Sequence, residues 1–441
     1  MTNMPPPATK GRRFHHKSRY GCAPCKRRRI KCDEKKPACG NCIQRSVECS
    51  FKSLEPTLKN QQLSKITTVG NASSPVPRGV PAGISGPGVD IPFCRSNTRD
   101  LELYCHFQIY TSTSLAQPVS LESLYREFIP SLAVSFPFVG HGLMSIAYIH
   151  LAAISPQGTS KKLLAESAYH VNQALPGYSE TIKNITPENS TPLFTFAMFV
   201  VLFTFANSSE ESGALLEIAR GQSRIEEKTI RALGTTAARV AQSIQNIFGI
   251  FWRCQHWISA GPMAAAIRRY LPPALSDSSM EWIRVEDTHL AKLPQIWEDD
   301  PTLTLAQSAA LSGSLACLRD TFAMVTQLTV LPPEDTESDT SNTRSNDLAN
   351  IHKQLCAGHL YDAPSVFTWY IRLSPDFLGM LEEGNKYAMV VLAHFAIVLH
   401  RACAGKWWTL RLSEHFVAMA DVILGEERRE WIEWPLTVIA T

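Results

Sequence analysis

The sequence lacks the signatures of catalysis, secretion and membrane insertion. It contains no G-x-S-x-G, H-E-x-x-H or G-x4-G-K-[ST] motif, so no nucleophile, catalytic metal or phosphate cradle is indicated. Residues 1–9 hold no apolar segment of a secretory signal, and we therefore expect an intracellular chain with reduced thiols. The most apolar run, residues 192–206, contains two threonines and is shorter than the roughly 20 residues that span a bilayer. We expect neither an enzyme nor a membrane-spanning protein.

The sequence also lacks strand patterns. After residue 50 it lacks cysteines at C-x2-C spacing. No segment alternates apolar and polar residues for long enough to predict a sheet. The later cysteines show no C-x2-C pair, which is typical of small core residues or free thiols. They are Cys94, Cys105, Cys254, Cys317, Cys356 and Cys403.

Charge of one sign is concentrated at the N-terminus. The whole chain has a net charge of only +3 over 441 residues. Residues 1–52 contain 14 Lys or Arg against 3 Asp or Glu, whereas the remaining residues contain 29 against 37. A strongly basic segment attached to a mildly acidic body indicates a nucleic-acid partner for the N-terminal segment alone.

Six cysteines dominate this basic segment. Their spacing is C-x2-C-x6-C-x6-C-x2-C-x6-C, so the first three recur with a constant offset of 17 residues. Thiolates at C-x2-C spacing are typical zinc ligands, and the repeat indicates a duplicated half-site. The six candidate ligands are Cys22, Cys25, Cys32, Cys39, Cys42 and Cys49.

The number of ligands predicts a shared metal site. Two tetrahedral zinc ions need eight ligand positions, and six sulfurs supply them only if two sulfurs bridge both ions. The duplication makes Cys22 and Cys39 equivalent, and we expect these two residues to bridge.

The two half-sites differ in charge. The first contains KRRRIK between its second and third cysteines, whereas the second contains IQRSVE, which is formally neutral. Pro24 favours the first turn of a helix, which we expect over residues 24–31. Such a helix fits the DNA major groove, where guanidinium groups pair with guanine. The segment between Lys10 and Arg19 adds a basic arm for phosphate contacts.

This cysteine pattern, with KRRRIKCD and Lys36-Pro37, resembles the fungal binuclear zinc-cluster DNA-binding domain. The resemblance covers about 30 residues and implies a zinc-stabilised module with two short helices that reads CGG-type triplets in double-stranded DNA. It implies base contacts from Arg28 and Arg29. The predicted phosphate contacts are Lys26, Arg27 and Lys31, together with Lys17 and Arg19 of the basic arm.

Other interpretations remain open for this segment. The cysteines are also compatible with a disulfide scaffold, an RNA-binding zinc knuckle or a metal-storage segment. The KRRRIK run is compatible with a solvated face or a nuclear-import signal, which can share residues with a DNA contact.

A linker is predicted after the cysteines. Leu54, Leu58 and Leu63 do not hold the apolar spacing of a coiled coil, so we expect a monomer or a homodimer formed elsewhere. Residues 69–93 are rich in Gly, Pro and Ser. The predicted organisation is a basic arm (1–21), a zinc-cluster domain (22–49), a flexible linker (50–96) and a large all-α C-terminal domain (97–441).

Helical patterns continue through this last domain. An amphipathic stretch is expected at 100–110, with Leu101, Tyr104, Cys105 and Gln108 on neighbouring turns. Thr186, Pro187 and Glu188 form a helix start before the apolar run, which we expect to be a buried helix. Other helices are expected at 137–154, from 161 to before Pro176, and at 240–269, 303–329, 376–402 and 409–433.

Segments of this domain, among them FPFVGHGLMSIAYIHLA and AMVVLAHFAIVLHR, resemble the helical effector domain of the fungal sterol uptake control proteins. The resemblance implies a regulatory domain and, in its sterol-sensing members, an apolar ligand. The candidate lining residues are Trp407, Trp408, Phe416, Trp431 and Trp434, with closure of the core as the alternative. Five histidines at helical spacing are expected in the core or at its rim: His141, His150, His170, His394 and His400.

Residues 332–347 carry five acids and one arginine among Ser, Thr, Asn and Pro, which predicts a disordered acidic loop that could contact coactivators. Together these features predict a nuclear, sequence-specific transcription factor of RNA polymerase II promoters with two zinc ions. By family tendency it is a pathway-specific activator of a fungal secondary-metabolite gene cluster. The alternatives are a sterol-responsive regulator and a nuclear scaffold with a zinc-stabilised interaction module.

Overall fold

The computed structural model divides the chain into two compact units, Met1–Ser85 and Gly86–Thr441. The basic arm with Lys17 and Arg19, the linker and residues 332–346 of the acidic loop lie outside the described residues. Within the first unit the structure describes residues 22–33, 35, 38–45, 47 and 49. Within the second it describes residues 98–116, 121–156, 159–222, 224–268, 276–331, 347–403 and 405–439.

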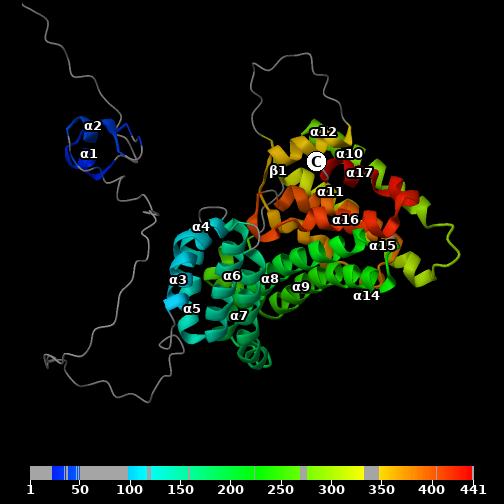
Figure 1. The fold of residues 1–441 in the computed structure, drawn as a ribbon, viewed down its shortest axis with the longest axis horizontal. Coiled ribbons are helices and arrows are strands. Elements are labelled where there is room, and N and C mark those ends of the chain that lie inside the picture. The colour runs from blue at the N-terminus through cyan, green and yellow to red at the C-terminus, as the bar shows by residue number, and fades with distance from the viewer. Residues whose placement is uncertain are drawn as a thin grey trace, which may run out of the picture. The chain divides into compact units, whose positions relative to one another are not determined.

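The first unit contains two short helices, α1 (Ala23–Arg27) and α2 (Gly40–Gln44), drawn in blue in Figure 1. Each helix begins directly after a cysteine, Cys22 or Cys39, which occupies the N-cap. The duplication in the sequence is therefore a duplication of structure. All six cysteines are at most 2% exposed and form the buried interior of the module.

Helix α1 is shorter than the predicted helix over 24–31. It ends at Arg27, and Arg29 has a left-handed backbone with φ of 55°. The Ile30 N–H donates to the Cys25 carbonyl (3.1 Å) and the Arg29 N–H donates to the Lys26 carbonyl (3.1 Å). These two bonds define a Schellman motif, in which glycine usually occupies the left-handed position. The helix ends early because this turn satisfies its last carbonyls.

The second unit is predominantly helical, as predicted. Its first half contains α3 (Thr98–His106), η3 (Phe107–Thr111), α4 (Ser112–Leu115), η5 (Leu124–Phe128), α5 (Ile129–Ser135), α6 (Pro137–Ile154), α7 (Ser160–Thr181), α8 (Pro187–Arg220), α9 (Glu227–Ala260) and η6 (Pro262–Ala265). Its second half contains α10 (Asp277–Leu290), η7 (Leu293–Ile296), α11 (Leu305–Leu328), α12 (Leu348–Ala357), η8 (Ala363–Phe367), α13 (Thr368–Ile371), α14 (Pro375–Glu382), α15 (Lys386–Cys403), η9 (Trp407–Thr409), α16 (Leu412–Leu424), η10 (Glu426–Ile432) and α17 (Glu433–Ile439).

Strands are limited to one pair in the described part of the unit. Strand β1 (Thr329–Val330) pairs antiparallel with β2 (His359–Leu360), with Thr329 opposite Leu360. Figure 1 shows α3 and α5 at one end of the unit and α10, α12 and α17 at the other. One continuous apolar core joins these ends through α6, α8, α9 and α15.

Helix α8 begins as the sequence predicts. The Thr186 N–H donates to Asn189 Oδ1 (2.8 Å) in a capping box, and Pro187 occupies the first turn. The helix then continues to Arg220, well past the apolar run at 192–206. By length and composition α6, α8 and α15 could each cross a membrane, but 72%, 67% and 89% of their most apolar windows are buried inside the fold.

Helix α6 has the predicted bounds, whereas other predictions need correction. Helix α7 continues through Pro176 to Thr181, and the helix expected over 376–402 is two helices broken at Gly384, whose φ is +68°. The amphipathic face of α3 was also assigned wrongly. Leu101 is 60% exposed, and the buried side chains are Leu103 and, in η3, Phe107.

Candidate zinc centre and nucleic-acid interface

The sulfurs of the cysteine module converge from both half-sites. Cys22 Sγ lies 3.5 Å from Cys39 Sγ and 3.7 Å from Cys42 Sγ. Cys39 Sγ lies 3.6 Å from Cys25 Sγ. The ligand atoms of these four cysteines all lie within 4.8 Å of one another. The central pair, Cys22 and Cys39, therefore contacts C-x2-C partners on both sides, which fits the predicted bridging arrangement.

The third cysteine of each half-site is held by the backbone of the first. The Cys22 N–H points to Cys32 Sγ (3.4 Å) and the Cys39 N–H points to Cys49 Sγ (3.5 Å). Backbone donors of this kind stabilise thiolate charge and orient the sulfur as a second coordination shell. The same contact in both halves preserves the pseudo-symmetry of the site.

The donor set fits zinc in its chemistry. Burial, reinforced by neighbouring sulfurs, raises the pKa of the Cys25 thiol and raises the pKa of Cys42 to about 12. Buried thiols with a raised pKa become thiolates at neutral pH when a cation beside them supplies positive charge. All-sulfur tetrahedral coordination is typical of zinc, and this module has no other substantial core among its described residues.

Among the described residues, two hydrogen bonds outside the sulfur cluster also join the half-sites, and neither was predicted from the sequence. The Asp33 carboxylate accepts hydrogen bonds from the Gly40 N–H at the start of α2 (3.1 Å to each oxygen). Asn41 Nδ2 donates to the Lys31 carbonyl (2.7 Å). A carboxylate at a helix N-terminus is favourable, and here it fixes the chain that follows KRRRIK against α2.

The predicted DNA-binding cations form an exposed basic surface, which we define as Lys26, Arg27, Arg28, Arg29 and Lys31. All five side chains are exposed. Lys26 and Arg27 occupy the last turn of α1, Arg28 caps it and Arg29 follows in the left-handed turn. The carbonyl end of a helix favours positive charge. The turn thus presents the two predicted base-reading arginines beyond the end of α1 rather than along its side.

The comparison with known proteins agrees with this geometry. Residues 20–57 match the family model described as the fungal Zn(2)-Cys(6) binuclear cluster domain. The chain therefore carries a binuclear zinc-cluster domain, which binds two zinc ions.

Similarity outside this domain is more distant. A Zn(2)-C6 fungal-type transcription factor of Gibberella zeae is 23% identical, in an alignment covering 99% of this chain and 87% of that relative. The Zn(2)-C6 fungal-type transcription factor afumD of Aspergillus fumigatus is 25% identical over 47% of this chain, and the match spans 53% of its own length.

The sterol uptake control protein 2 of Saccharomyces cerevisiae is 54% identical over 44 residues, which are 10% of this chain and 5% of that protein. This likeness is confined to the N-terminal part. The predicted resemblance of the helical domain to that group gains no support from it.

The aromatic residues predicted to line one ligand pocket lie in separate places. Phe416 is fully buried, and each tryptophan packs against a different aromatic neighbour. The ring pairs are Trp407 with His150, Trp408 with Phe205, Trp431 with Tyr387 and Trp434 with Phe322. Core closure, the alternative interpretation, accounts for all of these contacts except the position of Trp407 beside a pocket.

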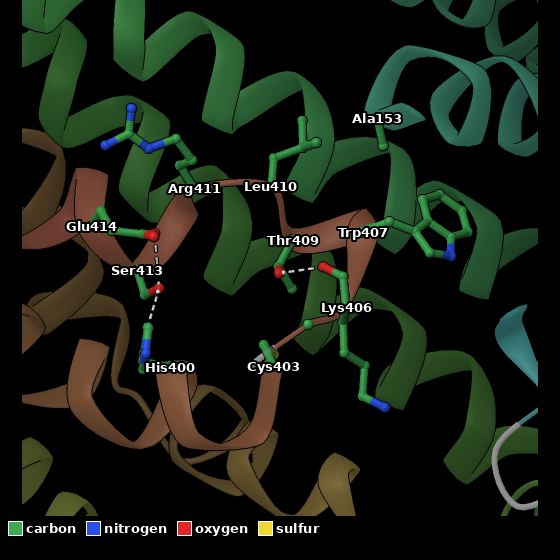
Figure 2. Close-up of a pocket in the computed structure, with 11 residues that line it drawn as sticks. Ala153, His400, Cys403, Lys406, Trp407, Thr409, Leu410, Arg411, Ser413 and Glu414 are labelled. Carbon is green, nitrogen blue, oxygen red and sulfur yellow. Dashed lines mark hydrogen bonds between the residues drawn. The ribbon is translucent and has the colours of Figure 1, made fainter. Parts of the chain in front are cut away.

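Figure 2 shows this pocket, which has a volume of about 360 Å³ and lies mainly between the end of α15 and the start of α16. Its lining mixes apolar and polar groups and includes Lys406, Arg411 and Glu414. Leu410 in its wall has φ of 49°. A second pocket of about 280 Å³, between α7, α8 and α9, has a more apolar lining with Leu175, Tyr178 and Ile247.

The predicted histidines lie in the core or at its rim. His150, His170 and His394 are buried, and His141 and His400 are half-buried. Burial lowers the pKa of all five, to about 4 for His150 and about 3 for His394. They are therefore neutral at neutral pH.

A buried charged pair was missed by sequence reasoning. Arg401 Nη2 donates to Glu286 Oε1 (2.6 Å), and both side chains are 1% exposed. Thr326 Oγ1 donates to the second carboxylate oxygen of Glu286 (3.1 Å), and Arg401 Nε donates to His352 Nδ1 (3.2 Å). The two charges are 115 positions apart, so no local pattern signals their contact.

Proposed function

We propose that the protein is a nuclear, sequence-specific DNA-binding transcription factor of RNA polymerase II promoters. The observation that carries the proposal is the exposed basic surface built onto a buried six-cysteine cluster. A relative that spans nearly the whole chain is itself named a transcription factor, a class that is generally not enzymatic.

In this proposal the six cysteines hold two zinc ions, with Cys22 and Cys39 bridging. Each ion then has four sulfur ligands, and the ions supply the folding energy that the tiny core does not, on the order of 10–16 kcal/mol per structural site. Cys25 and Cys32 complete the first site, and the equivalent cysteines of the second half complete the other. The metal-stabilised fold holds α1 and its Schellman turn in one orientation.

Arg28 and Arg29 read bases in the major groove, and the other members of the basic surface contact phosphates. Guanidinium groups pair with O6 and N7 of guanine, so a guanine-containing half-site of the CGG type is the expected target. Lys17 and Arg19 of the basic arm add phosphate contacts and salt dependence. The exposed turn supports this role because it leaves both arginine side chains accessible.

The helical unit is proposed as an effector domain that recruits coactivators or senses a ligand. The pocket at Trp407 has a mixed lining with three charged residues, whereas the pocket near Leu175 is more apolar and is the better candidate for an apolar ligand. The finer role we propose is activation of a single biosynthetic gene cluster. A sterol-responsive regulator is the second candidate, and it would depend on that apolar pocket.

Genome-wide occupancy by the full-length protein, measured beside expression in cells that lack it, tests this role. Peaks at one cluster of adjacent biosynthetic genes that fall silent in the mutant support a pathway-specific activator. Peaks over sterol synthesis and uptake promoters support the second candidate. Chromatin association without preferred sequences would instead support a nuclear scaffold.

A further inference from the structure

The helical unit contains a second group of metal-ligand side chains, far from the cysteine module in the sequence. His352 and Cys356 are four residues apart on α12 and therefore share one helix face, and His400 on α15 lies opposite them. One ligand atom from each residue lies within 4.8 Å of the other two. We propose that these three residues bind a third zinc ion.

The separations match tetrahedral coordination. Cys356 Sγ lies 3.4 Å from His352 Nε2. Zinc bonds of about 2.3 Å to sulfur and about 2.0–2.1 Å to nitrogen give an edge of about 3.5 Å between such atoms at a tetrahedral angle. The pair on α12 thus already has the spacing that one ion requires, before any side chain moves.

The hydrogen bonds around His400 leave one of its nitrogens available. Ser413 Oγ donates to Glu414 Oε2 (3.1 Å), so its own oxygen accepts the proton of His400 Nδ1 (3.4 Å). Figure 2 shows this chain of contacts at the edge of the pocket. Neutral histidine carries one ring proton, and the lone pair of His400 is therefore on Nε2. A hydroxyl and a carboxylate behind a histidine are a typical outer shell of a zinc ligand.

His352 is arranged differently. Its Nδ1 accepts from Arg401 Nε, so the neutral ring carries its proton on Nε2, facing Cys356. Binding of Zn²⁺ at Nε2 requires the ring proton to move to Nδ1, which ends the hydrogen bond from Arg401 Nε, while Cys356 releases its thiol proton to solvent. The ion then accepts one lone pair from His352 Nε2 and one from the Cys356 thiolate, and Arg401 stays paired with Glu286.

One of the three ligands borders a pocket. His400 lines the pocket of about 360 Å³ at the α15–α16 connection, whereas His352 and Cys356 are not among its lining residues. In this proposal the ion reaches the group from the side of His400, and a water molecule completes four-coordination. Because α12 and α15 each supply ligands, the ion would join these two helices.

The test is the zinc content of the full-length protein after dialysis against micromolar zinc, measured by elemental analysis. The proposal predicts three ions per chain for the unmodified protein and two for both Cys356→Ser and His400→Gln. The control Cys105→Ser removes an exposed cysteine outside the group and should keep three. Two ions in the unmodified protein, or three in Cys356→Ser, would overturn the proposal.

Cobalt substitution gives a second readout that does not depend on overall stability. Subtracting the Co²⁺ spectrum of Cys356→Ser from that of the unmodified protein should leave a thiolate-to-cobalt charge-transfer band. Unchanged binding of the variant to DNA shows that the cysteine module is intact. A flat difference spectrum would show that the group is only a hydrogen-bonded contact.

Discussion

Cys22 Sγ and Cys39 Sγ lie 3.5 Å apart at the centre of the cysteine module. These residues are equivalent members of the two half-sites, and each is the N-cap of its own short helix. The start of both helices and the centre of the metal site thus coincide. Loss of either sulfur should affect the module as a whole, whereas loss of a peripheral sulfur should affect one half.

Replacing a bridging cysteine should release both zinc ions of the module. We expect Cys22→Ser to lose two ions relative to the unmodified protein, because each ion would keep only three sulfur ligands. Cys49→Ser, at the periphery, is the matched control and should weaken one ion. Native mass spectrometry counts the ions, and retention of the full complement by Cys22→Ser would refute the bridging assignment.

We expect Arg29 to lower the stability of the cysteine module while it contributes to base recognition. The left-handed backbone costs an L-residue about 1–2 kcal/mol, which glycine does not pay. Arg29→Gly should therefore hold its zinc against a chelator at least as well as the unmodified protein. It should also lose about 1–3 kcal/mol of discrimination between a CGG-type site and a scrambled site.

The exposed Arg45, just after α2, provides the matched control for this experiment. Arg45→Gly removes the same charge from the second half-site and should leave base discrimination unchanged. Equal loss of affinity for all sequences in Arg29→Gly would show that Arg29 contacts phosphate rather than bases.

The basic arm should determine part of the salt dependence. Deleting residues 10–19, which include Lys17 and Arg19, should reduce the slope of log affinity against log salt by about 0.9 for each phosphate that the arm neutralises. Fluorescence anisotropy at several salt concentrations measures the slope. An identical slope after deletion would place the arm away from DNA.

Breaking the buried ion pair should destabilise the helical unit strongly. Arg401→Met leaves the Glu286 carboxyl group buried without its ionic partner, with an expected cost of about 3–5 kcal/mol in the free energy of unfolding. The neighbouring pair between Asp287 and Arg319 is partly exposed, and Asp287→Asn should cost only about 0.2–1 kcal/mol. Denaturant titrations measure the free energy of unfolding of both variants. Similar losses in Arg401→Met and Asp287→Asn would argue against full desolvation of the pair between Arg401 and Glu286.

The stability of the helical unit should fall on mild acidification. Burial lowers the pKa of His394 to about 3, so the unfolded chain takes up its proton first as pH drops below 6.5. The stability that the helical unit gains from a neutral His394 is fully present above pH 6.5 and is lost progressively toward pH 3. Between pH 7 and pH 5 this histidine alone should cost about 2 kcal/mol, following about 1.36 kcal/mol per unit.

His394→Gln should reduce this pH dependence, because glutamine does not titrate. The comparison uses denaturant midpoints of both proteins at pH 7 and pH 5. If the two proteins lose equal stability between these pH values, His394 is not the group that titrates.

Sequence predictions that depend on nearby residues succeed more often here than those that depend on contacts between distant segments. The cysteine spacing, the bounds of α6 and the cap at Thr186 depend on nearby residues, and the structure agrees with them. The end of α1 was missed because glycine, the usual signal for a left-handed cap, is replaced by Arg29. Pro176 stays within α7, although a proline in that position predicts a helix end.

Features formed by distant segments were not predictable. The contact between Arg401 and Glu286 joins α15 to α10, and His400 meets His352 and Cys356 from another helix. The tryptophans of the C-terminal segment are close in sequence, but η9, η10 and α17 carry them to different parts of the core. Only the packing of the helices determines which side chains share a site.

Selection of binding sites from a random pool of double-stranded DNA by the zinc-loaded, full-length protein tests the central claim most directly. We predict enrichment of guanine-containing, CGG-type half-sites, abolished by a chelator and relaxed by Arg28→Ala. A pool that binds without enrichment of any sequence would contradict the assignment of this chain as a sequence-specific DNA-binding regulator.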